Sequence, residues 1–358
     1  MIPIYEPYLP EGSLDYAHDA LRSGWISSKG EYISKATKAL ENITGCYVQL
    51  VSNGTAATHL LAKALKYKHP HITKIIVPNN VYVAAWNSFM YEGGYELIPI
   101  DCDLLTWNML LHDLDEVIDE STALLAVHNL GNIINIPALQ RRFPNLVIIE
   151  DACEAFLGEY EDKPAGSTAY CSSYSFFGNK NITAGEGGAF ITKDEDTYKY
   201  IKNTHSQGLS DEQYIHHNLG YNYRMTNIHA AILLGQLDRL TEINDKKREI
   251  AQYYRSSLSE SSGFYFQHEV EGTQHSNWMV GVGKRGGSSS EIRKVLHYNN
   301  IDTRPMFYPM SSHSYIPYAN RSQEGGARLL AEECFMLPSY PSLTEDELAY
   351  IVRTLKQL

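Results

Sequence analysis

The sequence has little positive charge. Among its 358 residues, 30 are Lys or Arg and 42 are Asp or Glu, which gives a formal net charge of −12 at pH 7. Nucleic acids and anionic membrane surfaces are bound through accumulated Lys and Arg, and the sequence contains no basic block. We therefore expect neither as a partner. Any anionic ligand must be held by local groups that act against the overall field of the protein.

Cysteine is scarce too, and its arrangement argues against metal and redox sites. The five cysteines are odd in number, and no CxxC pair occurs among Cys46, Cys102, Cys153, Cys171 and Cys334. A zinc site or a redox dithiol would be expected to show such a pair. We interpret them as buried thiols of a reducing compartment, and we predict no metal site.

A long apolar run is also missing. The longest uncharged stretch, residues 121–140, is interrupted by His128, by three asparagines and by Pro137, which bilayer insertion would penalise. The first residues, MIPIYEPYLPEGS, lack the positive segment and apolar run of a secretory signal. We therefore expect a cytoplasmic protein without a membrane span.

The sequence does contain a regular alternation of short apolar runs and longer amphipathic stretches. Strands are expected at residues 47–52, 74–78, 95–100, 123–127, 145–150, 171–177 and 188–192. Helix-length segments between them, starting near Thr55, Tyr82 and Ile136, indicate βαβ units. The predicted fold class is α/β, with a largely parallel sheet that helices cover on both faces.

A second, smaller unit follows. Residues 228–258 have apolar residues at helical spacing and predict one or two long helices. Beyond them we expect strands at 263–268 and 277–283, a helix at 288–299 and a closing helix from about Thr344. The predicted domains are residues 1–235, which form the N-terminal segment and the large domain, and residues 236–358.

Three polar motifs follow expected strands, and ligands of open parallel sheets bind beyond the carboxyl ends of the strands. The first motif is VSNGTAA, residues 51–57, where a strand runs into a turn of small residues and then a helix. Unpaired N–H groups at the start of that helix, with Gly54 allowing close approach and the Thr55 hydroxyl beside it, predict a phosphate cradle. The same residues make a good helix cap, so this motif alone leaves both interpretations open.

The second motif is NLVIIEDACEA, residues 145–155, in which Glu150 and Asp151 end an apolar strand. A buried carboxylate needs a partner. Capping the next turn is the simplest role for either acid, and we favour it for Glu150. For Asp151 the alternative is a salt bridge to the protonated ring nitrogen of a cofactor.

The third motif is SYSFFGNKNITAGEGGAFIT, residues 173–192. Its Lys180 lies between Phe177 and the turn GEGG at 185–188, which can desolvate the amine and so suit it to Schiff-base formation. A phosphate cradle, an acid about 30 residues before a lysine, and that lysine in a tight loop together match the needs of pyridoxal phosphate (PLP).

Longer motifs resemble one family over nearly the whole chain. They are SGWISSKG (23–30), SNGTAA (52–57), EDACEA (150–155), SFFGNKNITAGEGG (175–188), GYNYRMTNIHAAI (220–232), DTRPMFYP (302–309) and LPSYPSL (337–343). In these segments the sequence is similar to the sugar aminotransferases of the DegT/DnrJ/EryC1/StrS family, which have fold type I. The resemblance implies a PLP-dependent aminotransferase with a mostly parallel seven-stranded sheet in the large domain and a small C-terminal α/β domain.

The resemblance also implies the catalytic residues. Lys180 would form the Schiff base, and Asp151 would pair with the pyridine nitrogen. Dehydratase relatives have His in place of Lys180, so the lysine indicates amino transfer. Glu154 stands where most members have Gln near the phenolic oxygen of the cofactor, which makes its protonation state important. The segment HNLGNIINI (128–136) replaces the usual His-Leu-Tyr-Gly-x-Pro, which leaves the shape of this loop open.

The remaining cofactor contacts implied by the resemblance concern the phosphate and the ring. Gly54, Thr55 and the Ser175 hydroxyl would hold the phosphate. Asn222 would reach it from the neighbouring subunit, which implies a homodimer with shared sites. Tyr82 would stack on the cofactor, although packing in the core is the alternative for an aromatic residue at a helix start.

Three segments, SGWISSKG, SFFGNK and TRPMFYP, most resemble the family members that aminate C4 of GDP-4-keto-6-deoxy-D-mannose with L-glutamate as donor. Arg304 and Tyr308 are candidates for binding the sugar or its diphosphate, because Arg presents a fork of donors to phosphate oxygens. A structural ion pair is the alternative for Arg304. Trp25, Ser27 and Ser28 are candidates for the sugar pocket, and core packing is the alternative for Trp25.

Two other functions stay open at this point. A 4-aminotransferase acting on dTDP- or UDP-4-keto-6-deoxyglucose would use the same chemistry on a different base and a different C2 configuration. A regulatory protein that keeps PLP without turnover belongs to another class. The presence of Lys180, Asp151 and TRPMFYP argues against it.

Overall fold

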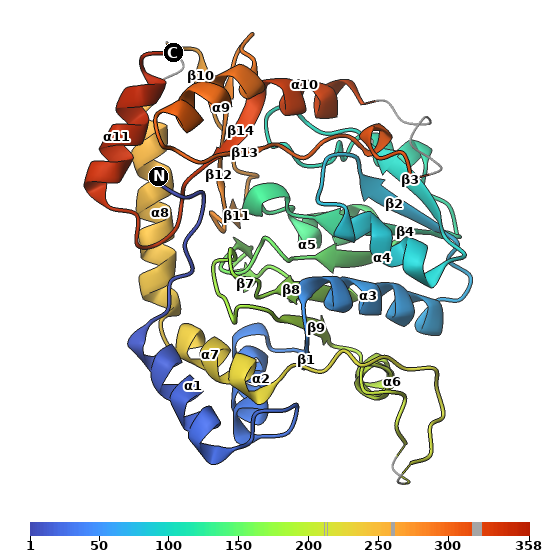
Figure 1. The fold of residues 1–358 in the computed structure, drawn as a ribbon. Coiled ribbons are helices and arrows are strands. Elements are labelled where there is room, and N and C mark those ends of the chain that lie inside the picture. Colours follow the sequence, from blue (N-terminus) through green and yellow to red (C-terminus); the bar gives the residue numbers. More distant parts are fainter. Residues whose placement is uncertain (211, 213, 259–261, 317–323) are drawn as a thin grey trace.

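The computed structural model of the chain describes residues 1–210, 212, 214–258, 262–316 and 324–358 (Figure 1). In this part the central sheet has seven strands in the order β1-β9-β8-β5-β4-β2-β3. They are β1 (Tyr47–Val51), β2 (Lys74–Pro78), β3 (Glu96–Ile100), β4 (Thr122–Val127), β5 (Val147–Asp151), β8 (Cys171–Ser175) and β9 (Gly188–Thr192). β9 pairs antiparallel with β1 and β8, and the other pairs are parallel. The prediction of a mostly parallel seven-stranded sheet is confirmed.

Helices cover both faces of this sheet. Leu124 and Leu125, neighbours in β4, enter two separate hydrophobic cores. The core with Leu124 includes residues of α1 (Glu11–Ser23), α2 (Glu31–Thr44), α5 (Ile136–Arg142) and α7 (Asn227–Leu237). The core with Leu125 includes residues of α3 (Gly54–Lys68), α4 (Ala84–Glu92) and α6 (Glu195–Thr204). Because both faces are dry, the strands are apolar on both sides, as the sequence indicates.

A second sheet lies beyond α8 (Leu240–Ser257). It has four antiparallel strands in the order β10-β12-β14-β13. Its elements are β10 (Phe264–Tyr265), β12 (Val280–Lys284), α9 (Ser289–Tyr298), β13 (Arg304–Pro305), α10 (Gly325–Glu333), β14 (Cys334–Leu337) and α11 (Glu345–Leu355). The predicted small α/β unit is therefore present, although β13 and β14 lie outside the predicted strands. The predicted boundary at residues 235 and 236 falls near the end of α7 and stays a prediction.

The strand expected at 277–283 begins later, at Val280, because Asn277 has a left-handed φ of 52° that does not fit a strand. A small three-stranded sheet, β11-β6-β7, precedes this point. Its strands are β6 (Glu159–Tyr160), β7 (Lys163–Pro164) and β11 (Thr273–Gln274). This sheet therefore pairs the segment before β12 with the segment that follows β5.

The N-terminal residues of the chain lie against the small unit, where Ile2 forms a β-bridge with Ile301 (Figure 1). Short 3₁₀ turns occur at Asp113–Glu116, Asn129–Gly131 and Met310–Ser312. Across the described residues, no helix has both the length and the apolar composition that crossing a membrane requires.

Candidate active site

A cavity of about 910 Å³ lies at the carboxyl ends of the sheet strands. The turns after β1, β5 and β8 line one side of it, and residues 304–308 of the small unit line another. Nine of the residues predicted for the site contribute to its wall, namely Gly54, Thr55, Tyr82, Asp151, Glu154, Ser175, Lys180, Arg304 and Tyr308. The fold therefore brings together residues that lie far apart in the sequence.

The start of α3 forms a cradle in this wall. Asn53 caps the helix by accepting the N–H of Ala56, while the N–H groups of Gly54 and Thr55 have no hydrogen-bond partner among the described residues. A Cβ on Gly54 would lie 2.6 Å from Cβ of Ser175, so only glycine permits this approach of helix and strand. The cap and the cradle are thus both present. Free N–H groups at a helix start with hydroxyls beside them suit a phosphate.

Asp151, at the end of β5, is 6% exposed. Its Oδ1 accepts the N–H of Cys153 at 3.0 Å and the hydroxyl of Ser173 at 3.3 Å. These bonds orient a carboxylate that also lines the cavity. A carboxylate held in this way can accept a hydrogen bond from a protonated ring nitrogen, as the sequence predicts for this residue.

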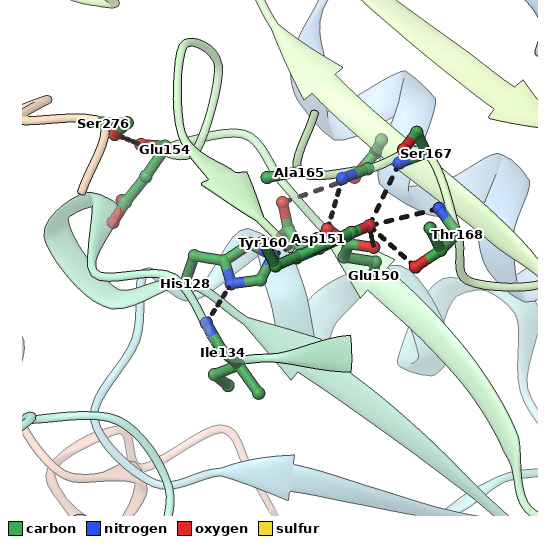
Figure 2. Close-up of polar contacts among 12 residues, drawn as sticks. His128, Ile134, Glu150, Asp151, Glu154, Tyr160, Ala165, Ser167, Thr168 and Ser276 are labelled. Carbon is green, nitrogen blue, oxygen red and sulfur yellow. Dashed lines mark hydrogen bonds and ion pairs between the residues drawn. The ribbon is translucent and has the colours of Figure 1, made fainter. Parts of the chain in front are cut away.

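The expectation that Glu150 caps the next turn is wrong, because Asp151 does so. Side chains of a strand alternate between faces, so Glu150 points to the opposite face. There it is fully buried and contacts His128 Nε2 at 2.7 Å, the hydroxyl of Tyr160 at 3.2 Å and the N–H of Gly166 (Figure 2). The carboxylate therefore has several partners within the core.

His128 connects this network to the neighbouring loop. Its Nδ1 accepts the N–H of Ile134 at 2.9 Å, so the proton of the neutral ring is on Nε2, which donates to Glu150 (Figure 2). The loop that follows His128 contains Leu130 in a left-handed conformation with φ 54°, and the N–H of Leu130 donates to Oε2 of Glu154 at 2.9 Å. This is the shape that the segment 128–136 takes in place of the usual motif.

Glu154 and Lys180 meet inside the cavity. Nζ of Lys180 lies 3.9 Å from Oε1 of Glu154, and the lysine side chain is only 13% exposed. Burial raises the pKa of Glu154 to about 7, against the opposing effects of Lys180 and the Leu130 N–H. The side chain of Lys180 is thus largely buried instead of lying on the surface, and the pKa of its acidic neighbour lies near neutral pH.

Aromatic and cationic side chains line the other wall. Tyr82 is 61% exposed, and its ring lies 6.3 Å from that of Phe307, so packing in the core does not apply to it. The guanidinium of Arg304 lies 5.1 Å from the ring of Tyr5, and no ion pair with a described carboxylate occupies it. Tyr308 is 49% exposed. This wall offers ring faces and a cation to a ligand.

Four predicted residues, Asn222, Trp25, Ser27 and Ser28, lie outside the cavity wall. Asn222 is exposed, and its Oδ1 accepts a hydrogen bond from Arg224 at 2.9 Å. Trp25 is 60% exposed, and Ser27 is exposed as well. Packing of Trp25 in the core does not occur in this chain, and the roles expected for the four residues stay predictions.

Trp278 is a wall residue that sequence reasoning missed. Its ring centroid lies 3.8 Å from Nζ of Lys180. The sequence offers one signal that could have identified it. Tryptophan is rare in this chain, which has 4, and Trp278 stands at the start of a predicted strand.

The residues present fit PLP. The cradle at Gly54 would hold the phosphate. The buried Asp151 would accept a hydrogen bond from a protonated ring nitrogen, and the largely buried Lys180 would react with the aldehyde carbon. In the described part of the chain, no group of three or more His, Cys, Asp or Glu side chains could hold a metal ion.

Comparisons with known proteins identify one family. The sequence pattern of the DegT/DnrJ/EryC1/StrS aminotransferase family matches residues 8–356. The chain is 37% identical to a GDP-perosamine synthase of Escherichia coli O157:H7 over 363 residues, which cover 99% of this chain and 98% of the relative. It is 33% identical to a GDP-perosamine synthase of Vibrio cholerae over 373 residues, with 99% and 98% covered.

A solved structure of E. coli GDP-4-keto-6-deoxy-D-mannose-3-dehydratase with bound hydrated PLP is similar in fold. It superposes with a TM-score of 0.92 over 99% of both chains at 22% sequence identity. At this identity the likeness concerns the fold alone.

Proposed function

Because the chain belongs to the DegT/DnrJ/EryC1/StrS aminotransferase family, we propose that it transfers the amino group of L-glutamate to C4 of GDP-4-keto-6-deoxy-D-mannose. The products are GDP-perosamine and 2-oxoglutarate. The cofactor is PLP. The choice of nucleotide sugar is supported by the two relatives named GDP-perosamine synthase, which align over nearly their whole length.

One observation carries the proposal. A single cavity of about 910 Å³ holds the desolvated amine of Lys180, the oriented carboxylate of Asp151 and the phosphate cradle of α3. A protein that only binds a nucleotide sugar would need neither the amine nor the buried acid. Their presence in one cavity supports amino transfer.

The parts of the cofactor are assigned to side chains as follows. The N–H groups of Gly54 and Thr55, with the Ser175 hydroxyl, hold the phosphate. Asp151 would keep the ring nitrogen protonated, and the exposed ring of Tyr82 would be available to stack on the cofactor.

Bound PLP supplies an electron sink that makes the Cα–H of an amino acid acidic. Nζ of Lys180 takes that proton from glutamate, and later delivers a proton to C4 of the sugar. Glu154 lies 3.9 Å from this Nζ and has a pKa raised to about 7 by burial. Its carboxyl can therefore change its protonation near neutral pH while the lysine carries protons.

Arg304 is our candidate for the diphosphate of the sugar nucleotide. Its guanidinium lines the cavity without a carboxylate partner among the described residues, so its donors are available to phosphate oxygens. A protein with a net charge of −12 needs such a placed cation to attract an anionic substrate. Tyr308 beside it offers a ring and a hydroxyl to the sugar.

We propose further that the enzyme is a homodimer in which Asn222 completes the phosphate site of the partner subunit. The exposed position of Asn222, outside the cavity of its own chain, supports this arrangement. Asn222→Ala should weaken PLP binding, and mixing it with Lys180→Ala protein should restore some active sites if subunits exchange.

The test of the substrate is a side-by-side assay of GDP-, dTDP- and UDP-linked 4-keto-6-deoxy sugars with glutamate or glutamine. We expect turnover with the GDP sugar and glutamate, loss of turnover in Lys180→Ala, and normal turnover in the surface control Lys294→Ala. Preference for a dTDP or UDP sugar would contradict the proposed GDP-linked substrate. Absence of turnover with every sugar, in protein that binds PLP, would favour a regulatory role.

A further inference from the structure

Trp278 and Lys247 are neighbours of the site to which neither the sequence motifs nor the comparisons assign a role. Trp278 is 4% exposed and lines the cavity. Its ring centroid is 3.8 Å from Nζ of Lys180, and its Nε1–H donates to the carbonyl of Asn179 at 2.9 Å. The indole is therefore tied to the residue just before the lysine and covers the lysine's amine.

Lys247, in α8, holds the backbone of Trp278. It is 4% exposed, and its Nζ donates to the carbonyl of Trp278 at 2.8 Å and to the carbonyl of Ser339. Burial lowers the pKa of Lys247 to about 7. A neutral amine has two N–H groups, which these two carbonyls satisfy, so the contact persists whether or not the amine is charged.

The chain before Trp278 is also attached to the site. The hydroxyl of Ser276 donates to the carbonyl of Glu154 at 2.6 Å (Figure 2), and the carbonyl of Ser276 accepts from Nδ2 of Asn181 at 2.6 Å. Glu154 and Asn181 are both neighbours of Lys180, the first in space and the second in sequence. The position of the indole is thus coupled to that of the lysine from two directions.

We propose that Trp278, held by Lys247, positions the amine of Lys180. The lysine has a flexible four-carbon stem, and its ammonium has two attractive partners, the indole face at 3.8 Å and Oε1 of Glu154 at 3.9 Å. The quadrupole of the indole attracts the cation, and the buried setting strengthens that attraction. Without the ring the ammonium keeps only the carboxylate and moves towards it.

This placement rests on the proposed function, in which Lys180 captures PLP. In the capture, Nζ forms a C=N bond with the aldehyde carbon of PLP. The ammonium first gives one proton to the carboxylate of Glu154, 3.9 Å away, and the lone pair of the neutral amine then adds to the aldehyde carbon. The aldehyde oxygen leaves as water with the proton from Glu154 and one proton from nitrogen, and the last proton stays on nitrogen. The rate depends on how Nζ is directed at that carbon. Capture by the apoprotein therefore reports the position of the amine without requiring turnover.

The experiment measures capture of PLP by apoprotein, by stopped-flow absorbance and by borohydride reduction with mass spectrometry of the peptide that contains Lys180. Trp278→Leu should slow capture about tenfold, the size of a desolvated cation–π contact. Trp278→Phe, which keeps a ring with a weaker quadrupole, should fall between Leu and wild type. In turnover, kcat should fall while KM for glutamate stays unchanged.

Lys247 is tested by a double-mutant cycle. Lys247→Met should slow capture, and the double variant with Trp278→Leu should be no slower than Trp278→Leu alone, because Lys247 acts through Trp278. Lys284→Met is the matched control. Its Nζ also donates to a carbonyl, that of Ser262 at 2.7 Å, and lies 4.4 Å from the ring of Phe264, but it does not line the cavity.

The outcomes separate this proposal from the proposed function. The positioning role is overturned if folded Trp278→Leu protein captures PLP at the wild-type rate. It is also overturned if the reductions in capture rate caused by the two single substitutions add up in the double variant. If circular dichroism shows that the Leu variant does not fold, capture of PLP by Trp278→Phe at the wild-type rate overturns the positioning role instead. Wild-type protein that traps no PLP on Lys180 contradicts the proposed function itself.

Discussion

Replacing Glu154 by Gln is expected to change how the stability of the PLP-free protein depends on pH. Gln has nearly the shape of Glu, cannot ionise, and keeps an oxygen that can accept the N–H of Leu130, which donates to Glu154 at 2.9 Å. The substitution therefore removes the titration of this side chain and leaves its packing nearly unchanged.

The magnitude follows from the pKa. Burial raises the pKa of Glu154 from 4.5 to about 7, so the folded protein binds this proton more tightly than the unfolded chain does. The resulting stabilisation is fully present below pH 4.5 and is lost as the pH rises through 7. At about 1.36 kcal/mol per pKa unit, the whole effect is about 3.4 kcal/mol, of which about 2.5 kcal/mol falls between pH 5 and pH 8.

The assay is urea unfolding of the two apoproteins at one protein concentration across this pH range. The free energy of unfolding of Glu154→Gln, minus that of the wild type, should rise by about 2.5 kcal/mol from pH 5 to pH 8. Glu332→Gln, in which an exposed carboxylate is replaced, is the control for the change in charge. A difference that stays constant would refute the reasoning, because it would mean that Glu154 is ionised throughout.

Three further predictions concern other groups. Gly54→Ala places a methyl group 2.6 Å from Cβ of Ser175, so PLP affinity should fall at least about tenfold in a fluorescence titration, with an unchanged circular dichroism spectrum. Arg304→Met should raise KM for the GDP sugar about tenfold or more, and steady-state kinetics should show no change in KM for glutamate. Burial lowers the pKa of Lys247 to about 7, so above that pH the unfolded chain binds more protons than the folded one. The free energy of unfolding of the wild type, minus that of Lys247→Met, should therefore rise by about 2.7 kcal/mol from pH 6 to pH 9. Urea unfolding measures this difference, and a difference that does not change with pH would contradict the prediction.

Much of the fold could be predicted because its signals are local. Each strand of the large sheet is a short apolar run bounded by turn residues, and α3 begins where Asn53 can cap it. The strands β13 and β14 escaped prediction. β13 has only two residues, and four-residue β14 follows α10 without a turn. Asn277 shortened another strand through a backbone conformation that its residue type permits but does not require.

The candidate site divides in the same way. Gly54, Asp151 and Lys180 could be found because each stands in a short motif at a strand end, where parallel strands place their ligands. The role of Glu150 was mistaken because the face to which a strand residue points depends on the register of the whole strand. Trp278 was missed because its contact with Lys180 joins residues nearly a hundred positions apart, which no local pattern announces.

The sequence by itself determined the α/β class, the mostly parallel sheet and the groups that suit PLP, because apolar periodicity, turn residues and short motifs act over a few neighbouring residues. Only the tertiary structure decided the pKa of Glu154, the tautomer of His128 and the attachment of Trp278 to Lys247. These properties depend on burial and on partners from distant parts of the chain. Desolvation and pairing exist only once those parts have packed together.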